Sequence, residues 1–205
     1  MYATTSDFHQ FQALDDSDTA DDALIAQLLT RAQALIETET RRLFEASADT
    51  TRYFSVLEDT DWMWLLLDHD LCAITSIDTG DGNVYATSDY HVSDGTLLWV
   101  TEPANSTPIH AIKLLQSSGL VWTYTTDPEN AIAVTGRWAY STTAPADIVH
   151  ATVRLAVWLY HQRDAGGEGD RPVITADGSV VLPSRLPADV ADICSNYVRR
   201  KVRSF

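Results

Sequence analysis

The sequence is poor in positive charge. It has 14 Lys and Arg residues against 29 Asp and Glu, which gives its 205 residues a formal net charge of −15. A protein that grips nucleic acid needs a basic footprint, so this balance argues against that role. Four of the basic residues, Arg199, Arg200, Lys201 and Arg203, lie in the last seven positions, and subtracting their charges leaves −19 on the rest. The sequence therefore describes an acidic body with a basic tail.

Cysteine and long apolar runs are also scarce. The two cysteines, Cys72 and Cys194, are far apart and lack metal-site spacing, so we expect buried, reduced thiols in a protein made in a cytosol. No apolar run has the length of a membrane span, and we expect no membrane partner. The first residues show no basic segment followed by an apolar one, so no signal peptide is expected.

Motifs for catalysis or cofactor binding are missing as well. The triplet Asp68-His69-Asp70 offers two carboxylates and an imidazole, but neighbouring side chains on a strand point to opposite faces. We interpret it as the end of a strand and a turn. His150, Arg154 and His161 line one helix face and predict a buried or interfacial polar strip. The sequence thus predicts no catalytic, cofactor-binding or metal-binding residue and no enzymatic activity.

The stretch from Pro145 to Arg163 organises the rest of the chain. Its apolar residues predict a helix that is covered by protein on most of its circumference. Such a helix is either purely a core helix or a core helix that also packs on a neighbouring subunit, and both interpretations stay open. The residues that we expect at a subunit interface are Val149, Val153, Val157 and Tyr160.

Three further helices are expected. Ser6 is a candidate cap for a short helix that carries Phe8, Phe11 and Leu14 on one side. A capping-box-like start at Thr19 opens an amphipathic helix that runs to about Leu43. Pro187 opens the last helix, which ends in the basic residues of the tail.

Between about Thr51 and Tyr140 the helical period disappears and short apolar runs alternate with turn residues. The run from Gly80 to Asn83 predicts a hairpin turn, and the short spacing favours antiparallel pairing. Candidate strands are Arg52–Leu57, Met63–Leu67, Ala73–Asp78, Asn83–Ala86, Tyr90–Val92, Thr96–Val100, His110–Leu115, Leu120–Thr125 and Ala131–Tyr140. A further hairpin is expected from Val173–Thr175 and Val180–Leu182.

The predicted fold class is therefore α+β, a small helical bundle with an inserted antiparallel β region. Residues 1–50 and 141–205 are expected to form the helical core, and residues 51–140 the β insertion. Five of the six tryptophans lie in the β region. Trp62 and Trp64 are two residues apart, so on a strand they share a face that is either core or a subunit contact, and we favour core.

Several stretches together resemble a known family. They are YATTSDF, DDALIAQLLTRAQALIETETRRLF, LLLDHDLCAITSIDTGDGNVYATSDYHV, AIAVTGRWAYS, PADIVHATVRLAVWLYHQRD and LPADVADICSNYVRR. In this order they are similar to head–tail connector (adaptor) proteins of tailed bacteriophages and of phage-like gene transfer agents. The resemblance implies a structural virion protein that forms a homo-oligomeric ring, typically twelve-fold, under the portal vertex. It also implies two partners, the portal protein and a stopper or tail component, with DNA passing through the lumen without specific binding.

The basic tail has two interpretations. As a docking element, Arg199, Arg200, Lys201, Val202, Arg203 and Phe205 would bind the portal ring through charges and apolar anchors. Alternatively, the arginines only complete the end of the last helix. Other functions also stay open: a stopper, a tail terminator, a monomeric binding module, or an enzyme with an unrecognised site near Asp68 and His69.

Overall fold

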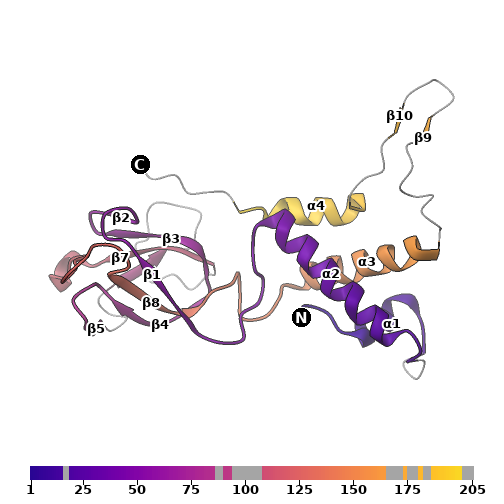
Figure 1. Ribbon diagram of the computed structural model, residues 1–205, viewed down its shortest axis with the longest axis horizontal. Helices are drawn as coiled ribbons and strands as arrows, with labels where there is room; N and C mark the ends of the chain where they lie inside the picture. Colours follow the sequence, from indigo (N-terminus) through magenta and orange to yellow (C-terminus); the bar gives the residue numbers. More distant parts are fainter. Residues whose placement is uncertain are drawn as a thin grey trace. The chain divides into compact units, whose positions relative to one another are not determined.

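The computed structural model describes residues 1–15, 19–85, 90–93, 108–164, 173–174, 180–181 and 186–199. It confirms the α+β fold class, with helices at both ends of the chain and antiparallel sheets between them (Figure 1). The chain divides into two compact units. A helical unit comprises Met1–Arg41 and Pro145–Arg199, and a β unit is built on Arg42–Ala144. The predicted domain boundaries at residues 50 and 141 stay a prediction.

The helical unit is built around α3 (Ala146–Asp164), which contacts α1 (Thr5–Gln12), α2 (Asp22–Thr40) and α4 (Ala188–Tyr197). The apolar period of α3 explains this, because Ile148, Leu155 and Ala156 are completely buried. The other helices bury one stripe each. The buried apolar residues that they contribute are Phe8, Ile25, Leu29, Ala32, Ile36, Val190 and Cys194.

The helix ends correct three predictions. Thr4, rather than Ser6, caps α1 in a reciprocal capping box: Thr4 N–H donates to the Asp7 carboxylate (2.7 Å) and Asp7 N–H to Thr4 Oγ1 (3.2 Å). Helix α2 has Asp21 as its N-cap, without a side-chain capping bond, so the predicted box at Thr19 does not start it. It also ends three residues earlier than expected, because Arg41 takes the left-handed conformation (φ 56°).

The described strands of the β unit form two four-stranded sheets in which every pair is antiparallel, as predicted. The first has the order β1 (Thr50–Phe54), β8 (Ile132–Arg137), β4 (Ala73–Asp78) and β5 (Val84–Tyr85). The second has the order β2 (Thr60–Asp61), β3 (Trp64–Leu71), β7 (Ile109–Leu114) and β6 (Tyr90–Ser93). A 3₁₀ turn, η2, covers Gln116–Ser118. In the helical unit, β9 (Val173–Ile174) and β10 (Val180–Val181) form the expected hairpin.

The two sheets share one hydrophobic core. Its fully buried members include Leu65, Leu71, Ile77, Ile112 and Ile132. Trp122 and Trp138 are also buried, and each indole N–H finds a backbone carbonyl, that of Met63 (2.9 Å) and that of Thr50 (2.9 Å) respectively. These two tryptophans are therefore core residues whose polar atom is also satisfied.

Two strand predictions in this unit are wrong. The run Leu120–Thr125 has a β-rich composition but is irregular, since the Trp122 indole and the Thr123 N–H, which donates to Thr79 O (2.9 Å), bond outside any ladder. The strand expected to end at Leu67 continues to Leu71 through a shift in its register with β7, so Asp68-His69-Asp70 is not a turn. The strand expected at Thr96–Val100 lies outside the described residues.

The turn predicted at Gly80 is confirmed. It joins β4 to β5, and the Asp78 carboxylate accepts N–H bonds from Gly80 (2.8 Å) and Gly82 (3.0 Å). Both glycines have positive φ. A Cβ at Gly80 would lie 1.7 Å from Thr123 O, so no other residue fits there.

Candidate interaction surfaces

The triplet Asp68-His69-Asp70 separates into an exposed pair and a buried acid. The side chains of Asp68 and His69 are 55% and 53% exposed, with Nδ1 of the histidine 2.7 Å from Oδ2 of the aspartate. Asp70 is 3% exposed and lies away from solvent. The expected divergence of adjacent side chains thus holds for Asp70, but it is wrong for the first two residues, which meet at the surface.

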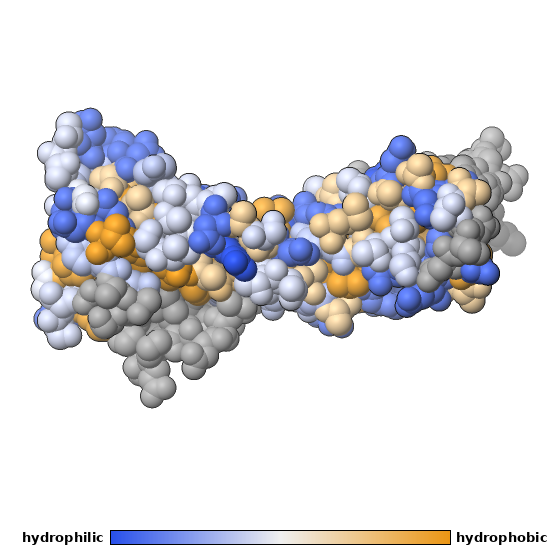
Figure 2. Space-filling view, turned by 90° about the horizontal axis from the view of Figure 1, so that it is seen from below, coloured by the Kyte–Doolittle hydropathy of each residue, from blue (hydrophilic) through white to orange (hydrophobic). Residues whose placement is uncertain are grey.

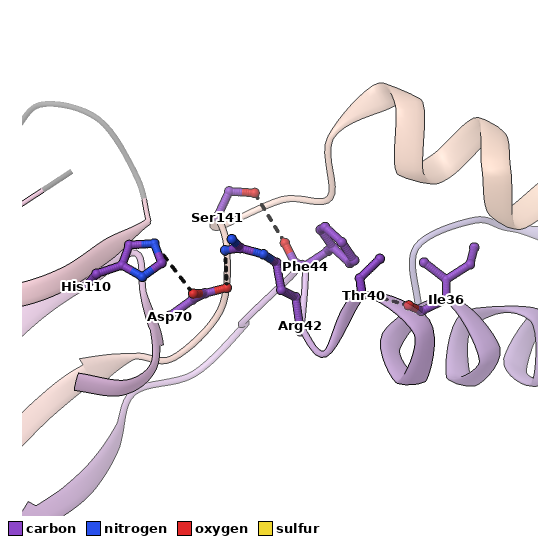
Figure 3. Close-up of polar contacts among 7 residues, drawn as sticks. All are labelled: Ile36, Thr40, Arg42, Phe44, Asp70, His110 and Ser141. Atoms are coloured by element: carbon purple, nitrogen blue, oxygen red, sulfur yellow. Dashed lines mark hydrogen bonds and ion pairs between the residues drawn. The ribbon is translucent and has the colours of Figure 1, made fainter. Parts of the chain in front are cut away.

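Asp70 belongs to a buried polar cluster that the sequence did not reveal. Arg42 Nη1 donates to Asp70 Oδ2 at 2.7 Å, and His110 Nε2 lies 3.8 Å from Asp70 Oδ1 (Figure 3). The guanidinium also lies 5.4 Å from the centre of the Tyr140 ring. Since Arg42 is the first residue of the β unit, this pair attaches the start of that unit to β3, next to His110 of β7.

The segments by which the chain enters and leaves the β unit run side by side. Ser141 Oγ donates to Phe44 O at 3.2 Å (Figure 3). Next to this bond, Tyr140 N–H donates to Leu43 O (2.7 Å), and Glu45 and Ser141 form an isolated parallel bridge. Phe44 is fully buried. Together with the Arg42–Asp70 pair, these bonds hold the entering segment, residues 42–45, against the leaving segment, residues 140–141. We call these two segments the base of the β unit.

The polar strip of α3 is used within the helical unit. His150 lies against the ring of Phe11 (5.7 Å between centroids), and Arg154 Nε donates to Asp189 Oδ2 (2.9 Å). His161 Nε2 lies 3.0 Å from the side-chain nitrogen of Gln12. These three side chains therefore connect α3 to α1 and α4 and do not converge on a common point.

The expected subunit-interface residues of α3 divide into two kinds. Val153 and Val157 are 4% and 5% exposed in the single chain. Val149 and Tyr160 are half-buried, and the Tyr160 hydroxyl donates to Asp21 Oδ2 (2.5 Å). Only Val149 and Tyr160 therefore offer appreciable surface to a neighbouring subunit, and the interface remains a prediction.

No protein-family model matches the chain, and no curated protein matches its sequence. Solved structures that contain a chain of similar fold include two particle necks. One is the neck of an empty gene transfer agent (GTA) particle, computed with C6 symmetry, at a TM-score of 0.55, 16% identity and coverage of 98% of this chain and 90% of the other. The other is the neck of a native GTA particle, computed with C12 symmetry, at a TM-score of 0.50, 16% identity and coverage of 90% and 85%.

The chain has the fold of GTA neck chains. The resemblance inferred from the sequence is thereby confirmed at the level of the fold, over nearly the whole chain. The GTA neck fold includes both units, because the first match covers 98% of the residues. Two surfaces of this chain are candidates for contacts with other proteins.

The basic tail is the first such surface. Of its predicted docking residues, Arg199 is described: its backbone N–H donates to Thr40 O at 2.9 Å, which ties the end of α4 to the end of α2. Arg200, Lys201, Val202, Arg203 and Phe205 lie outside the described residues. Portal docking therefore stays a prediction, with its starting point defined at Arg199.

The second surface is the loop between β2 and β3, and it corrects the interpretation of Trp62 as a core residue. Trp64 is half-buried beneath Lys113, whose Nζ lies 5.3 Å from the ring centre. Trp62 is 75% exposed, so placing it in the core with Trp64 was wrong. It does not share a strand face with Trp64, because it occupies the loop between β2 and β3.

In the described part of the chain, no group of three or more His, Cys, Asp or Glu side chains is placed to hold a metal ion. Among the same residues, no helix is both long and apolar enough to span a membrane. Cys72 and Cys194 are buried and free, as expected, and burial raises the pKa of both thiols.

Proposed function

We propose that this protein is a head–tail connector of a phage-like particle. Copies of the chain form a closed homo-oligomeric ring in the neck, between the portal and a stopper or tail component. The observation that carries this proposal is the likeness of fold to GTA neck chains along 98% of the sequence. One of those necks was computed with C12 symmetry, which favours a twelve-fold ring. The protein would be made in the host cytoplasm and located in the virion.

The charge of the chain supports a passage for DNA. A ring of acidic subunits, each with a net charge of −15, repels the phosphate backbone. DNA would then cross the lumen without specific binding. The same charge favours attraction between the acidic body and basic partner surfaces.

Ring closure would use heterologous contacts between neighbours. On α3 the proposed contact residues are Val149 and Tyr160, since Val153 and Val157 are already covered by the chain itself. The basic tail, which begins at Arg199, would dock onto the portal. Its position directly after α4 supports this, because the backbone bond from Arg199 to Thr40 holds the base of the tail on the helical unit.

We propose no catalytic activity and no cofactor. Asp68 lies against His69 and also pairs with Arg52, whose Nη1 is 3.5 Å from Asp68 Oδ1. Surface ion pairing explains why the side chains of Asp68, His69 and Arg52 lie together. This pairing supports a structural role over the enzyme alternative.

The proposal is tested by counting copies of the chain in purified particles. Isotope-labelled peptides of this chain and of the portal protein, added before mass spectrometry, give the ratio of the two. A ring predicts a constant ratio close to one chain per portal subunit. One copy per particle, or complete absence of the chain, would contradict the proposal. Recovery only with detached tails, and not with heads, would favour a tail terminator.

A further inference from the structure

An exposed tryptophan forms the tip of one hairpin of the β unit. Asp61 pairs with Trp64 across the end of the β2–β3 hairpin, which leaves Trp62 and Met63 as its two-residue loop. Met63 points into the core and is 6% exposed, whereas Trp62 is 75% exposed. The loop therefore anchors itself through one residue and presents the other to solvent.

The backbone at this tip is unfavourable for tryptophan. Trp62 has a φ of 51°, in the left-handed region that bulky residues rarely adopt. Two-residue hairpin loops that need a positive φ at their first position favour glycine or asparagine there. A tryptophan at this point gains little burial in return, so neither local conformation nor packing within the chain explains it.

Two segments that lead into or bond to this hairpin carry further exposed apolar side chains. Leu57 is 70% exposed and lies in the turn that leads into β2, and Val121 is 59% exposed. Val121 precedes Trp122, whose indole donates to the backbone carbonyl of Met63. We call Leu57, Trp62 and Val121 the Trp62 tip. In Figure 2, the β unit at the left of the view presents apolar surface among hydrophilic residues.

The exposed charged residues of the segments around the Trp62 tip are acidic, while the partly buried Lys113 lies over the ring of the neighbouring Trp64. The segments 53–63 and 114–136 contain no Lys or Arg. Their exposed charged residues are Glu58, Asp61, Asp127 and Glu129. The turn with the last two lies beside Leu57, since Val56 N–H donates to Pro128 O at 3.0 Å. This acidic border excludes nucleic acid as an occupant, and it would repel the same tip on a second copy.

We propose that the Trp62 tip docks into an apolar pocket bordered by Lys or Arg on a different protein. An exposed tryptophan, with exposed aliphatic side chains on segments bonded to its hairpin, has the composition of an interaction hot spot, and the acidic residues of these segments favour a basic counterpart. The inference rests on the proposed function, and it assigns the β unit to the contact with the neck component next to this chain. The contact to the portal remains with the tail.

The test uses the full chain with Trp62→Gly, expressed in producer cells in place of the wild-type gene. Glycine suits a positive φ, so the purified variant should melt at or above the wild-type temperature. Purified particles are then analysed for copies of this chain and of the other neck and tail proteins. We expect normal occupancy of this chain on heads and a drop of at least tenfold in one downstream component.

Matched variants separate the chemistry of the tip from general surface effects. Val84→Thr changes a side chain of similar exposure (69%) on β5, in the other sheet, and should assemble normally. Glu58→Lys combined with Glu129→Lys keeps the tryptophan and reverses two rim charges, and should reduce the same downstream component. If the Trp62→Gly chain assembles normally, the proposal is wrong.

Two further outcomes identify what failed. Loss of the Trp62→Gly chain itself from heads, with normal folding, would mean that the tip binds a second copy or the tail of this chain, which overturns the proposal. Absence of even the wild-type chain from particles would instead overturn the proposed function, and this inference with it. A photo-crosslinking residue at position 62 should join a partner at a site with Lys or Arg next to apolar residues.

Discussion

Replacing Arg42 by methionine should destabilise the β unit strongly. The change removes the guanidinium from Asp70, a carboxylate whose side chain is only 3% exposed, while Arg42 itself is 11% exposed. Removal of one partner of a buried ion pair costs about 3–5 kcal/mol, because the remaining charge stays buried after losing its charged partner. With a urea m-value of about 1–3 kcal/mol/M, a loss of 3 kcal/mol lowers the unfolding midpoint by roughly 1–3 M.

The measurement is urea unfolding followed by tryptophan fluorescence, which reports on the β unit through the buried Trp122 and Trp138. A double-mutant cycle gives the control. Arg42→Met with Asp70→Leu removes both charges together and should be less destabilised than Arg42→Met alone. Asp68→Asn, at an exposed ion pair with 3.5 Å between Arg52 Nη1 and Asp68 Oδ1, should cost less than about 1 kcal/mol. If Arg42→Met costs no more than Asp68→Asn, the buried pair does not hold the base of the β unit.

Three further predictions follow from single features. Gly80→Ala should lower the free energy of unfolding by about 2 kcal/mol or more, because its Cβ would lie 1.7 Å from a carbonyl oxygen. Gly82→Ala should cost less, because no atom lies within 4 Å of the added Cβ. Equal melting temperatures of the two variants would contradict this. Truncation after Arg199 should leave the melting temperature nearly unchanged but abolish attachment to portal-bearing capsids; truncated protein on capsids at normal occupancy would refute tail docking. Cys72 and Cys194 should react with a thiol reagent at pH 8 only after unfolding, since burial raises both pKa values; rapid reaction of the folded protein would contradict this.

Features with a strong local signal were predictable from the sequence. The 3.6-residue period of α3 and the glycine-rich turn at Gly80 each need only neighbouring residues to specify a structure. Antiparallel pairing was likewise predictable, because the connections were too short for parallel crossovers. The resemblance to connector proteins rests on the order of such elements, and the likeness of fold to GTA neck chains confirms it at that level.

Features that depend on distant residues were not predictable in this way. Asp70 is buried because Arg42, 28 positions earlier, reaches it, and nothing within the triplet indicates this partner. The run Leu120–Thr125 has the composition of a strand, yet its bonds go to Met63 and Thr79. A β-rich composition describes a half-buried surface in general, and a well-anchored loop satisfies it equally.

Trp62 was misplaced for a related reason. Spacing of two from Trp64 indicates a common face only if both residues lie on one strand, and the hairpin loop separates them. Tryptophan is so unusual at a loop position with positive φ that local preference argued against the observed structure. Departures of this kind from local rules are concentrated at functional positions, which is why we assign Trp62 to a binding surface.

A reconstruction of the neck in purified particles at side-chain resolution would test the proposed ring most directly. We expect a closed ring of this chain directly below the portal, with Val149 and Tyr160 of α3 at the contact between neighbours. We also expect the basic tail against the portal and Trp62 against the next neck protein. A neck whose ring is built from another chain, or a single copy of this chain outside any ring, would contradict the proposal.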